Sequence, residues 1–189
     1  VELEGNESAF IVFRKTNKVT EKKDNFPQKA IVYKIDTPWK ITFEAGKRGP
    51  KTPVVWSQLK DWMDSENDSI KYFSGQAVYE TTFTLEKLPQ KSLYIDLGNV
   101  MVMAKVTLNG HYVGGVWINP YRLNVTDYLR EGENKLEITV VNNWQNRLIG
   151  DQRLPEDQRL TWTTINPWKA DSSLQSSGLL GPVEIQFFD

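Results

Sequence analysis

The segment Lys135–Val141, KLEITVV, indicates the fold most clearly, because polar and apolar residues alternate along it. Leu136, Ile138 and Val140 share one face of an extended chain, and the polar residues between them share the other. An antiparallel strand with one face in a core and one face in water has this pattern. The segment therefore predicts a strand in a sheet that is solvated on one side.

The same alternation recurs at residues 39–43, 77–85, 93–97, 104–108 and 183–187. Turn residues separate these segments: Asn109-Gly110 matches a two-residue hairpin, in which both positions favour positive φ. Helical periodicity is limited to Ser57–Met63 and Thr126–Leu129, each enough for one or two turns. About eight strands with so little helix predict an all-β fold, a two-sheet antiparallel β-sandwich of the jelly-roll type.

The first 29 residues have a different character. Ala9–Phe13 (AFIVF) predicts a strand, and Lys15–Lys29 is polar, which is typical of a linker or an exposed loop. We therefore divide the chain into residues 1–29, an N-terminal strand and polar linker, and residues 30–189, the sandwich. The first part is either the edge of a preceding domain or an extra edge strand. Val1 is not a natural initiator, so we expect a mature chain or a part of a longer protein.

Composition excludes several classes of function. The formal net charge of −1 gives no electrostatic basis for binding nucleic acid. No apolar run approaches the roughly 18–20 residues of a membrane helix, so we expect no membrane insertion. The chain has no cysteine and one histidine, His111, which excludes disulfides, thiolate nucleophiles and imidazole-rich zinc sites. The sequence requires no cofactor.

Residues 142–155, NNWQNRLIGDQRLP, follow the KLEITVV strand and end the alternation. We predict a loop here, at one end of the sandwich, where such folds carry function. Residues 116–122 and 161–181 are two further loops rich in aromatic and amide groups. A pyranose packs its apolar face on an aromatic ring, and its hydroxyls bond planar donors and acceptors. The predicted ligand-binding residues are accordingly Trp117, Tyr121, Trp144, Asn146, Arg147, Asp151 and Trp168, with Trp162 as a further aromatic candidate.

A structural role competes with the binding role at several of these positions. Arg147 and Asp151 are four residues apart and can pair with each other to fix the loop while Trp144 packs. Asn142 and Asn143 can cap the strand end by bonding backbone groups. The tryptophans at positions 39, 56 and 62 are interpreted as core. No two carboxylates stand in a setting typical of a glycosidase pair, so no catalytic residue is predicted.

Several segments resemble the sugar-binding, galactose-binding-like domain of glycoside hydrolase family 2. The closing motif Ser177–Val183 is one of them, and the others are residues 70–75, 79–83, 96–98, 105–110, 113–114, 128–129 and 132–136. Asn143–Asp151 is similar to the C-terminal region of family 106 enzymes of the α-L-rhamnosidase type. Ser8–Arg14 (SAFIVFR) resembles the segment that ends the preceding domain in that family.

The resemblance implies a galactose-binding-like jelly roll from a bacterial protein that is periplasmic or extracellular. It also implies that the catalytic acids lie in a barrel domain outside this chain. The leading hypothesis is a non-catalytic carbohydrate-binding domain of an α-L-rhamnosidase-like glycoside hydrolase that acts on plant or host polysaccharide. The alternative is a structural domain that docks on the catalytic barrel of its parent protein without binding sugar. By family analogy a structural calcium is expected, with no ligands assigned.

Overall fold

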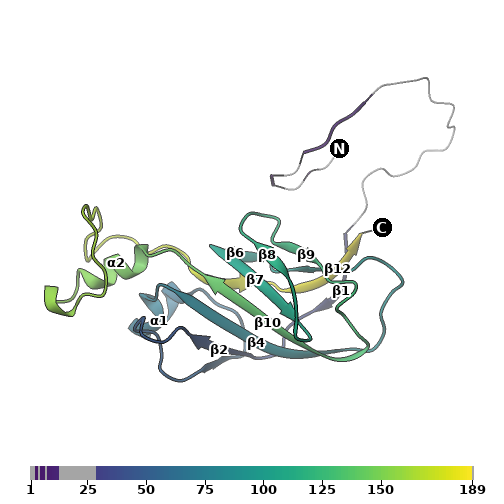
Figure 1. Cartoon of the computed structure of the whole chain (residues 1–189), viewed down its shortest axis with the longest axis horizontal. Coiled ribbons are helices and arrows are strands. Elements are labelled where there is room, and N and C mark those ends of the chain that lie inside the picture. Colours follow the sequence, from purple (N-terminus) through teal and green to yellow (C-terminus); the bar gives the residue numbers. More distant parts are fainter. Residues whose placement is uncertain (1–2, 4, 7, 13–28, 189) are drawn as a thin grey trace.

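The computed structural model describes residues 3, 5–6, 8–12 and 29–188. The described chain folds into short strands joined by turns, with four short helical segments (Figure 1). The strands are β1 (Lys29–Lys34), β2 (Trp39–Phe43), β3 (Val54–Trp56), β4 (Gln76–Leu85), β5 (Tyr94–Asp96), β6 (Asn99–Met101), β7 (Met103–Leu108), β8 (His111–Val116), β9 (Arg122–Asn124), β10 (Gly132–Val141), β11 (Gly178–Gly181) and β12 (Glu184–Phe188). The helical segments are η1 (Trp62–Asp64), α1 (Asp68–Lys71), α2 (Gln145–Asp151) and η2 (Glu156–Gln158).

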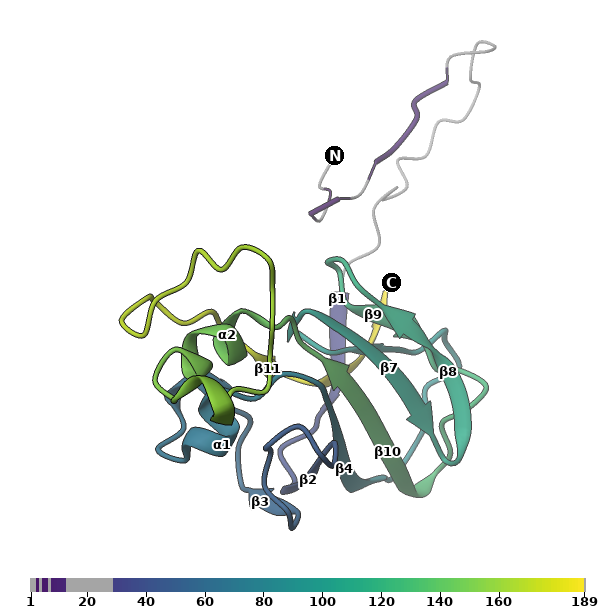
Figure 2. The same ribbon diagram turned by 60° about the vertical axis from the view of Figure 1, so that its left-hand side comes forward.

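Two main sheets face each other across the core. One has the strand order β3-β2-β4-β10-β7-β8, the other has the order β1-β12-β5-β9, and a small pair joins β11 to β6. All pairings between these strands are antiparallel. Figures 1 and 2 show α2 and the chain after it projecting from one end of this body. The prediction of an all-β, two-sheet antiparallel sandwich is confirmed.

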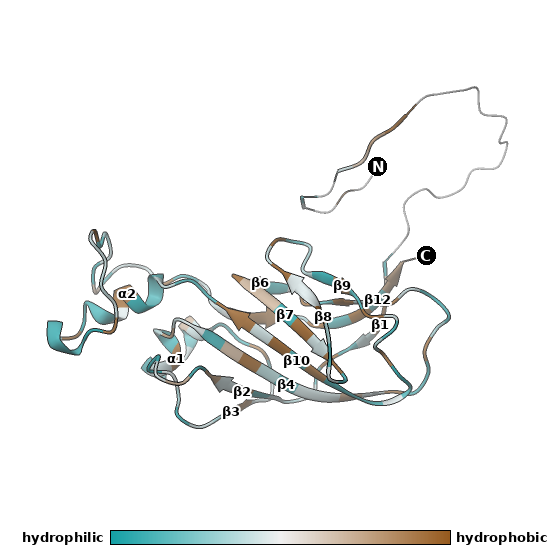
Figure 3. Ribbon diagram, in the orientation of Figure 1, coloured by the Kyte–Doolittle hydropathy of each residue, from teal (hydrophilic) through white to brown (hydrophobic). Residues whose placement is uncertain are grey.

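Strand β10, which contains the KLEITVV segment, lies at the centre of the six-stranded sheet. It pairs with β4 from Gly132 to Val141 and with β7 from Leu136 to Val141. Leu136, Ile138 and Val140 are completely buried, as the alternation predicted. Burying each such side chain contributes about 1.5–3 kcal/mol. Figure 3 shows the corresponding hydrophobic and hydrophilic bands along β4 and β10.

The β7–β8 hairpin turns at Asn109-Gly110, as predicted. Asn109 has φ 52° and Gly110 has φ 84°, the left-handed conformation that this turn requires. The Asn109 side chain also donates to the carbonyl of Tyr128 at 2.8 Å and to Asn134 Oδ1 at 2.9 Å. The turn is therefore tied to the chain entering β10.

An aromatic cluster closes the core near η1. Trp62 and Tyr79 are fully buried, and Trp62 Nε1 donates to Tyr79 Oη at 2.6 Å. The amide of Leu179 donates to the same oxygen at 3.2 Å. One hydroxyl thus joins η1, β4 and β11, and burial raises the pKa of Tyr79. Trp39 is buried too, whereas Trp56 is half-buried against the core.

The helical content was predicted less well than the strands. The loop predicted at residues 142–155 contains helix α2. Of the turns predicted over Ser57–Met63, only the end is helical, as part of η1, and α1 was not predicted. Helix α2 was not predicted because Asn146 and Gly150 have low helix propensity. Such a short helix is stabilised by tertiary contacts, which a local pattern does not reveal. Thr126–Leu129 forms a turn.

The strand expected near the N-terminus is not formed by the described residues. Residues 8–12 form no strand, and Phe10, Ile11 and Val12 are exposed. Phe13 and the linker up to residue 28 lie outside the described residues. The division of the chain at residues 29 and 30 stays a prediction.

Replacing Tyr79 by Phe should lower the free energy of unfolding by about 1–3 kcal/mol, because Trp62 Nε1 and the Leu179 amide become buried donors without an acceptor. Urea titration followed by tryptophan fluorescence measures the change. Tyr112→Phe is the matched control: because Tyr112 is 64% exposed, removing its hydroxyl should change the free energy of unfolding by no more than about 0.5 kcal/mol. Equal stability of the two variants would contradict this role for Tyr79.

Candidate functional site

Strand β10 ends at Val141, and the side chain of the next residue, Asn142, bonds backbone groups before β4. Asn142 Nδ2 donates to the Phe73 carbonyl at 2.8 Å, and its Oδ1 accepts from the Gly75 amide at 3.0 Å. Asn143 Oδ1 accepts from the Gln145 amide at 3.1 Å, at the start of α2. The predicted capping of the strand end is confirmed for Asn142, whereas Asn143 bonds the first residue of α2 instead. Their side chains direct the chain from the sheet into α2.

Asn146 connects α2 to the end of the long irregular segment that follows it. Its Nδ2 donates to the Gln175 carbonyl at 2.6 Å, and its Oδ1 accepts from the Gln175 amide at 2.8 Å. A third bond runs from Nδ2 to Ser177 Oγ at 3.2 Å. The side chain is completely buried. It therefore closes residues 152–174 into a long loop, here called the 152–174 loop, that leaves the sandwich and returns to it.

Asp151 fixes the middle of the 152–174 loop. Its Oδ2 accepts from the amides of Leu160 and Thr161 at 3.1 and 2.9 Å, and from Thr161 Oγ1 at 2.6 Å. Its Oδ1 lies 2.8 Å from Arg147 Nη2, so the predicted pairing of these two residues is confirmed. Asn146 and Asp151 are 0% and 1% exposed. They hold the loop in place, and neither presents a surface to a ligand as the sequence had suggested.

A cleft of about 540 Å³ lies between α2 and the 152–174 loop. Trp162 forms one wall and is 84% exposed. The lining combines that indole with one carboxylate, one guanidinium, two primary amides and two threonine hydroxyls. The lining residues are Leu148, Gln152, Glu156, Arg159, Leu160, Thr161, Trp162, Thr163 and Asn166. Sequence reasoning named Trp162 but missed the polar lining, which lies on an irregular segment without periodicity.

The other predicted aromatic residues do not join this cleft. Trp144 lies directly before α2 and is 63% exposed, which corrects the expectation that it packs. Trp168 is half-buried and does not line the cleft. Trp117 is exposed and Tyr121 is half-buried on the β8–β9 connection, which Figures 1 and 2 show apart from α2. Ligand contact at these four positions stays a prediction.

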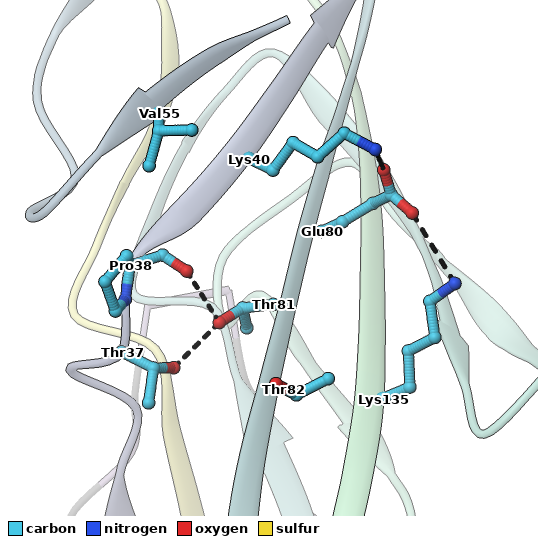
Figure 4. A pocket seen from close by; sticks show the side chains of 8 residues that line it. All are labelled: Thr37, Pro38, Lys40, Val55, Glu80, Thr81, Thr82 and Lys135. Atoms are coloured by element: carbon cyan, nitrogen blue, oxygen red, sulfur yellow. Dashed lines mark hydrogen bonds and ion pairs between the residues drawn. The ribbon is translucent and has the colours of Figure 1, made fainter.

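Another hollow, of about 400 Å³, lies over β2, β4 and β10 (Figure 4). Glu80 stands in it between Lys40 Nζ at 2.9 Å and Lys135 Nζ at 3.5 Å. The hydrogen bond from Lys40 and the charges of both lysines lower the pKa of Glu80 from its ordinary value of 4.5. Glu80 is therefore ionised at neutral pH, which is unsuitable for a general acid.

Metal and membrane chemistry gain no support from the described residues. In residues 3, 5–6, 8–12 and 29–188, no three His, Cys, Asp or Glu side chains gather where they could hold a metal ion. A structural calcium, which also takes backbone carbonyl oxygens as ligands, stays a prediction. Within the same residues, no helix has the length and hydropathy needed to cross a bilayer.

The family model for the glycosyl hydrolase 2 galactose-binding domain-like domain matches residues 56–174. The chain belongs to this family. The match includes β4 to β10, helix α2 and the cleft, and it confirms the galactose-binding-like fold. The resemblance to glycoside hydrolase domains that the sequence motifs suggested is thereby confirmed.

Relatives of this galactose-binding-like domain are parts of larger glycosidases. It is 44% identical to a putative beta-glucuronidase of Formosa agariphila, over 70% of this chain and 14% of that protein. It is 38% identical to a rhamnosidase from Novosphingobium sp. PP1Y, with a TM-score of 0.78 over 92% of this chain and 16% of that one. A beta-glucuronidase of an uncultured Clostridium sp., with a TM-score of 0.58 and 18% identity, shares the fold. The chain thus spans about one-seventh of these first two relatives.

Replacing Asn146 by Ala should lower the free energy of unfolding by about 1–3 kcal/mol, because the amide and carbonyl of Gln175 lose their partner and the buried Ser177 hydroxyl loses a donor. Asn99→Ala is the control, because Asn99 is exposed on β6 and takes no part in these hydrogen bonds. Hydrogen exchange should show faster exchange of the Gln175 amide in the Asn146 variant. Unchanged exchange there would contradict the anchoring role.

Glu80 should make stability depend on pH. Because its pKa is lower in the folded chain than its ordinary value of 4.5, its ion pairs stabilise the fold above that pH and are lost as the pH falls. Glu80→Gln should cost no more than about 1 kcal/mol at pH 7, since the pair is partly solvated. The difference from wild type should shrink as the pH falls below 4.5 and Glu80 becomes protonated. Glu133→Gln, at an exposed position of β10, is the control, and a pH-independent difference for Glu80→Gln would contradict the assignment.

Proposed function

We propose that this galactose-binding-like domain is a non-catalytic carbohydrate-binding domain of a bacterial, α-L-rhamnosidase-like glycoside hydrolase. The observation that carries the proposal is the α2 cleft, where an exposed indole stands among amide, carboxylate and guanidinium groups. The ring can pack on the apolar face of a pyranose, and Gln152, Asn166 and Arg159 can bond its hydroxyls. The cleft volume also falls in the range typical of small-ligand sites.

The cleft is organised before any ligand arrives. Asp151 makes its three hydrogen bonds to Leu160 and Thr161, directly before Trp162. The carboxylate itself is held by Arg147 within the same helix. A backbone fixed in this way lowers the entropy that binding would otherwise cost. Buried polar residues of α2 therefore support an exposed aromatic platform.

A non-catalytic role agrees with the carboxylates of the site. Glycoside hydrolysis commonly needs two carboxyl groups on opposite sides of the scissile bond. Glu156 is the one carboxylate among the residues that line the cleft. Glu80, in the other hollow, is held ionised by two lysines. The catalytic acids are thus expected in a barrel elsewhere in the parent protein.

The parent protein supplies the rest of the proposal. The chain corresponds to 16% of the solved rhamnosidase and 14% of the putative beta-glucuronidase, so its natural context is a much larger enzyme. We infer that this enzyme degrades plant or host polysaccharide in the periplasm or outside the cell. The catalytic domain of that enzyme is then a partner of this domain, besides carbohydrate.

Docking on the catalytic barrel is the second candidate function. Trp117 is 72% exposed and Ile118 is 53% exposed on the β8–β9 connection. Adjacent exposed apolar side chains are typical of interaction surfaces. A docking surface there is compatible with sugar binding at α2, because the two regions lie apart (Figure 2).

Replacing Trp162 by Ala should weaken saccharide binding at least about tenfold, because the ring that packs on the sugar is removed. Isothermal titration calorimetry of the full chain with L-rhamnose, galactose and pectin-derived oligosaccharides measures this effect. Trp117→Ala is the matched control, an equally large and exposed aromatic on another loop. Loss of binding in the Trp117 variant alone would place the site on the β8–β9 connection, and no binding by wild type would leave the docking function.

A further inference from the structure

A smaller hollow, of about 240 Å³, lies against α2 on a different face from the cleft that Trp162 lines. The cleft is lined by Leu148 and Gln152. This hollow is lined by Arg147, Gly150 and Leu154, which are three to four residues apart and therefore share another side of the helix and the turn after it. A Cβ atom at Gly150 would lie 2.7 Å from Tyr72 Cβ. The glycine therefore lets α2 and Tyr72 form a close-packed floor.

Three guanidinium groups from separate segments line this hollow. Arg48 comes from the β2–β3 loop, Arg147 from α2, and Arg153 from the turn after α2. Asp68 is the one carboxylate among the lining residues, and in the described chain no ion pair joins it to these arginines. Arg48 also has φ 58°, a backbone conformation that is uncommon for residues other than glycine. The hollow thus concentrates positive charge.

The two outer arginines are held in place by single contacts to the backbone. Arg48 Nη2 donates to the carbonyl of Gln158, and Arg153 Nε donates to the carbonyl of Ala170 at 3.3 Å. Arg153 Cζ also lies 5.5 Å from the centre of the Tyr72 ring. A guanidinium has five N–H groups, so each arginine keeps donors that bond no acceptor in the described residues. Both side chains are oriented, and both retain capacity for a ligand.

Arg147 adds a buried cation behind them. It is 6% exposed, and its Nε has no hydrogen-bond partner in the described chain. Burial lowers its pKa, Asp151 opposes that effect, and the charge of Arg48 lowers the pKa further. Arg48 and Arg147 line the same hollow, so their positive charges repel each other. An additional anion in the hollow would relieve this repulsion.

We propose that this hollow binds the oxyanion of an acidic saccharide, either the carboxylate of a uronic acid or a sulfate ester. Guanidinium groups recognise both oxyanions through paired hydrogen bonds. The inference rests on the proposed carbohydrate function, because the hollow and the Trp162 cleft share α2 and would contact neighbouring parts of one polysaccharide. It narrows the substrate class from carbohydrate in general to an anionic polysaccharide.

The test compares pairs of ligands that differ only in charge, using calorimetry on the full chain. Oligogalacturonate and its methyl ester form one pair, and sulfated and unsulfated galactan oligosaccharides of equal length form the other. Wild type should bind the acidic member of one pair at least about tenfold tighter, with affinity that falls as salt rises. Preference in the first pair identifies carboxylate and in the second identifies sulfate. No preference in either pair would overturn the proposal.

Variants assign the preference to the hollow. Arg48→Gln/Arg153→Gln should abolish the preference for the acidic ligand and leave the neutral ligand bound as before. Lys105→Gln/Arg130→Gln removes the same charge from exposed positions outside the hollow and should keep the preference. Asp68→Asn should act in the opposite direction and tighten acidic binding about two- to fivefold, since it removes a repelling carboxylate. A preference that survives in the double arginine variant would overturn the proposal.

Failure of the two proposals can be told apart. Neutral saccharide bound through Trp162 without preference for the acidic form overturns the anion site and keeps the carbohydrate function. Acidic saccharide bound through the arginines but unaffected by Trp162→Ala supports the anion site and overturns the role of the cleft. Absence of binding to every oligosaccharide overturns both.

Discussion

The end of the molecule that carries both hollows depends on the hydrogen bonds between the Asn146 side chain and the backbone of Gln175. These bonds join residues 29 positions apart and close the irregular segment between them. A seven-residue helix such as α2 is marginal on its own, so its stability must come from tertiary contacts. Burying an amide and a carboxylate costs free energy unless every group finds a partner. Asn146 meets that condition through Gln175 and Ser177, and Asp151 Oδ2 meets it through Leu160 and Thr161, while Asp151 Oδ1 is paired with Arg147. Helix and segment therefore stabilise each other.

This coupling explains why polar residues are concentrated directly after a core strand. The sandwich supplies a rigid end, at which Asn142 terminates β10 against the backbone before β4. Helix α2 then presents different faces to two hollows, one aromatic and amide-rich and the other rich in arginine. Fixed backbone beneath exposed Trp162 and oriented guanidinium groups is the arrangement expected for binding with little reorganisation. The same rigidity would serve a domain that positions polysaccharide for a separate catalytic barrel.

The sequence predicted those parts of the molecule whose pattern is local. Period-two alternation located the main strands, and Asn109-Gly110 located a hairpin, because side-chain direction in a strand and positive φ in a turn follow from neighbouring residues. The pairing of Arg147 with Asp151 was foreseen as an alternative because it follows from their spacing. The partners of Asn146 and the lining of the cleft depend on contacts between distant residues of an irregular segment. No periodicity encodes those contacts, and Trp117, Trp144 and Trp168 were therefore grouped with a site that they do not line.

The central claim is that saccharide packs on Trp162 at the α2 cleft. The seven tryptophans of the chain each give an indole N–H signal, which nuclear magnetic resonance can assign by single Trp→Phe variants and follow during titration with oligosaccharide. If saccharide packs on Trp162, the Trp162 signal should show a saturable shift, while the signals of buried Trp39 and of exposed Trp117 stay unchanged. A saturable shift of Trp117 without one at Trp162, or no shift at any indole, would contradict the central claim.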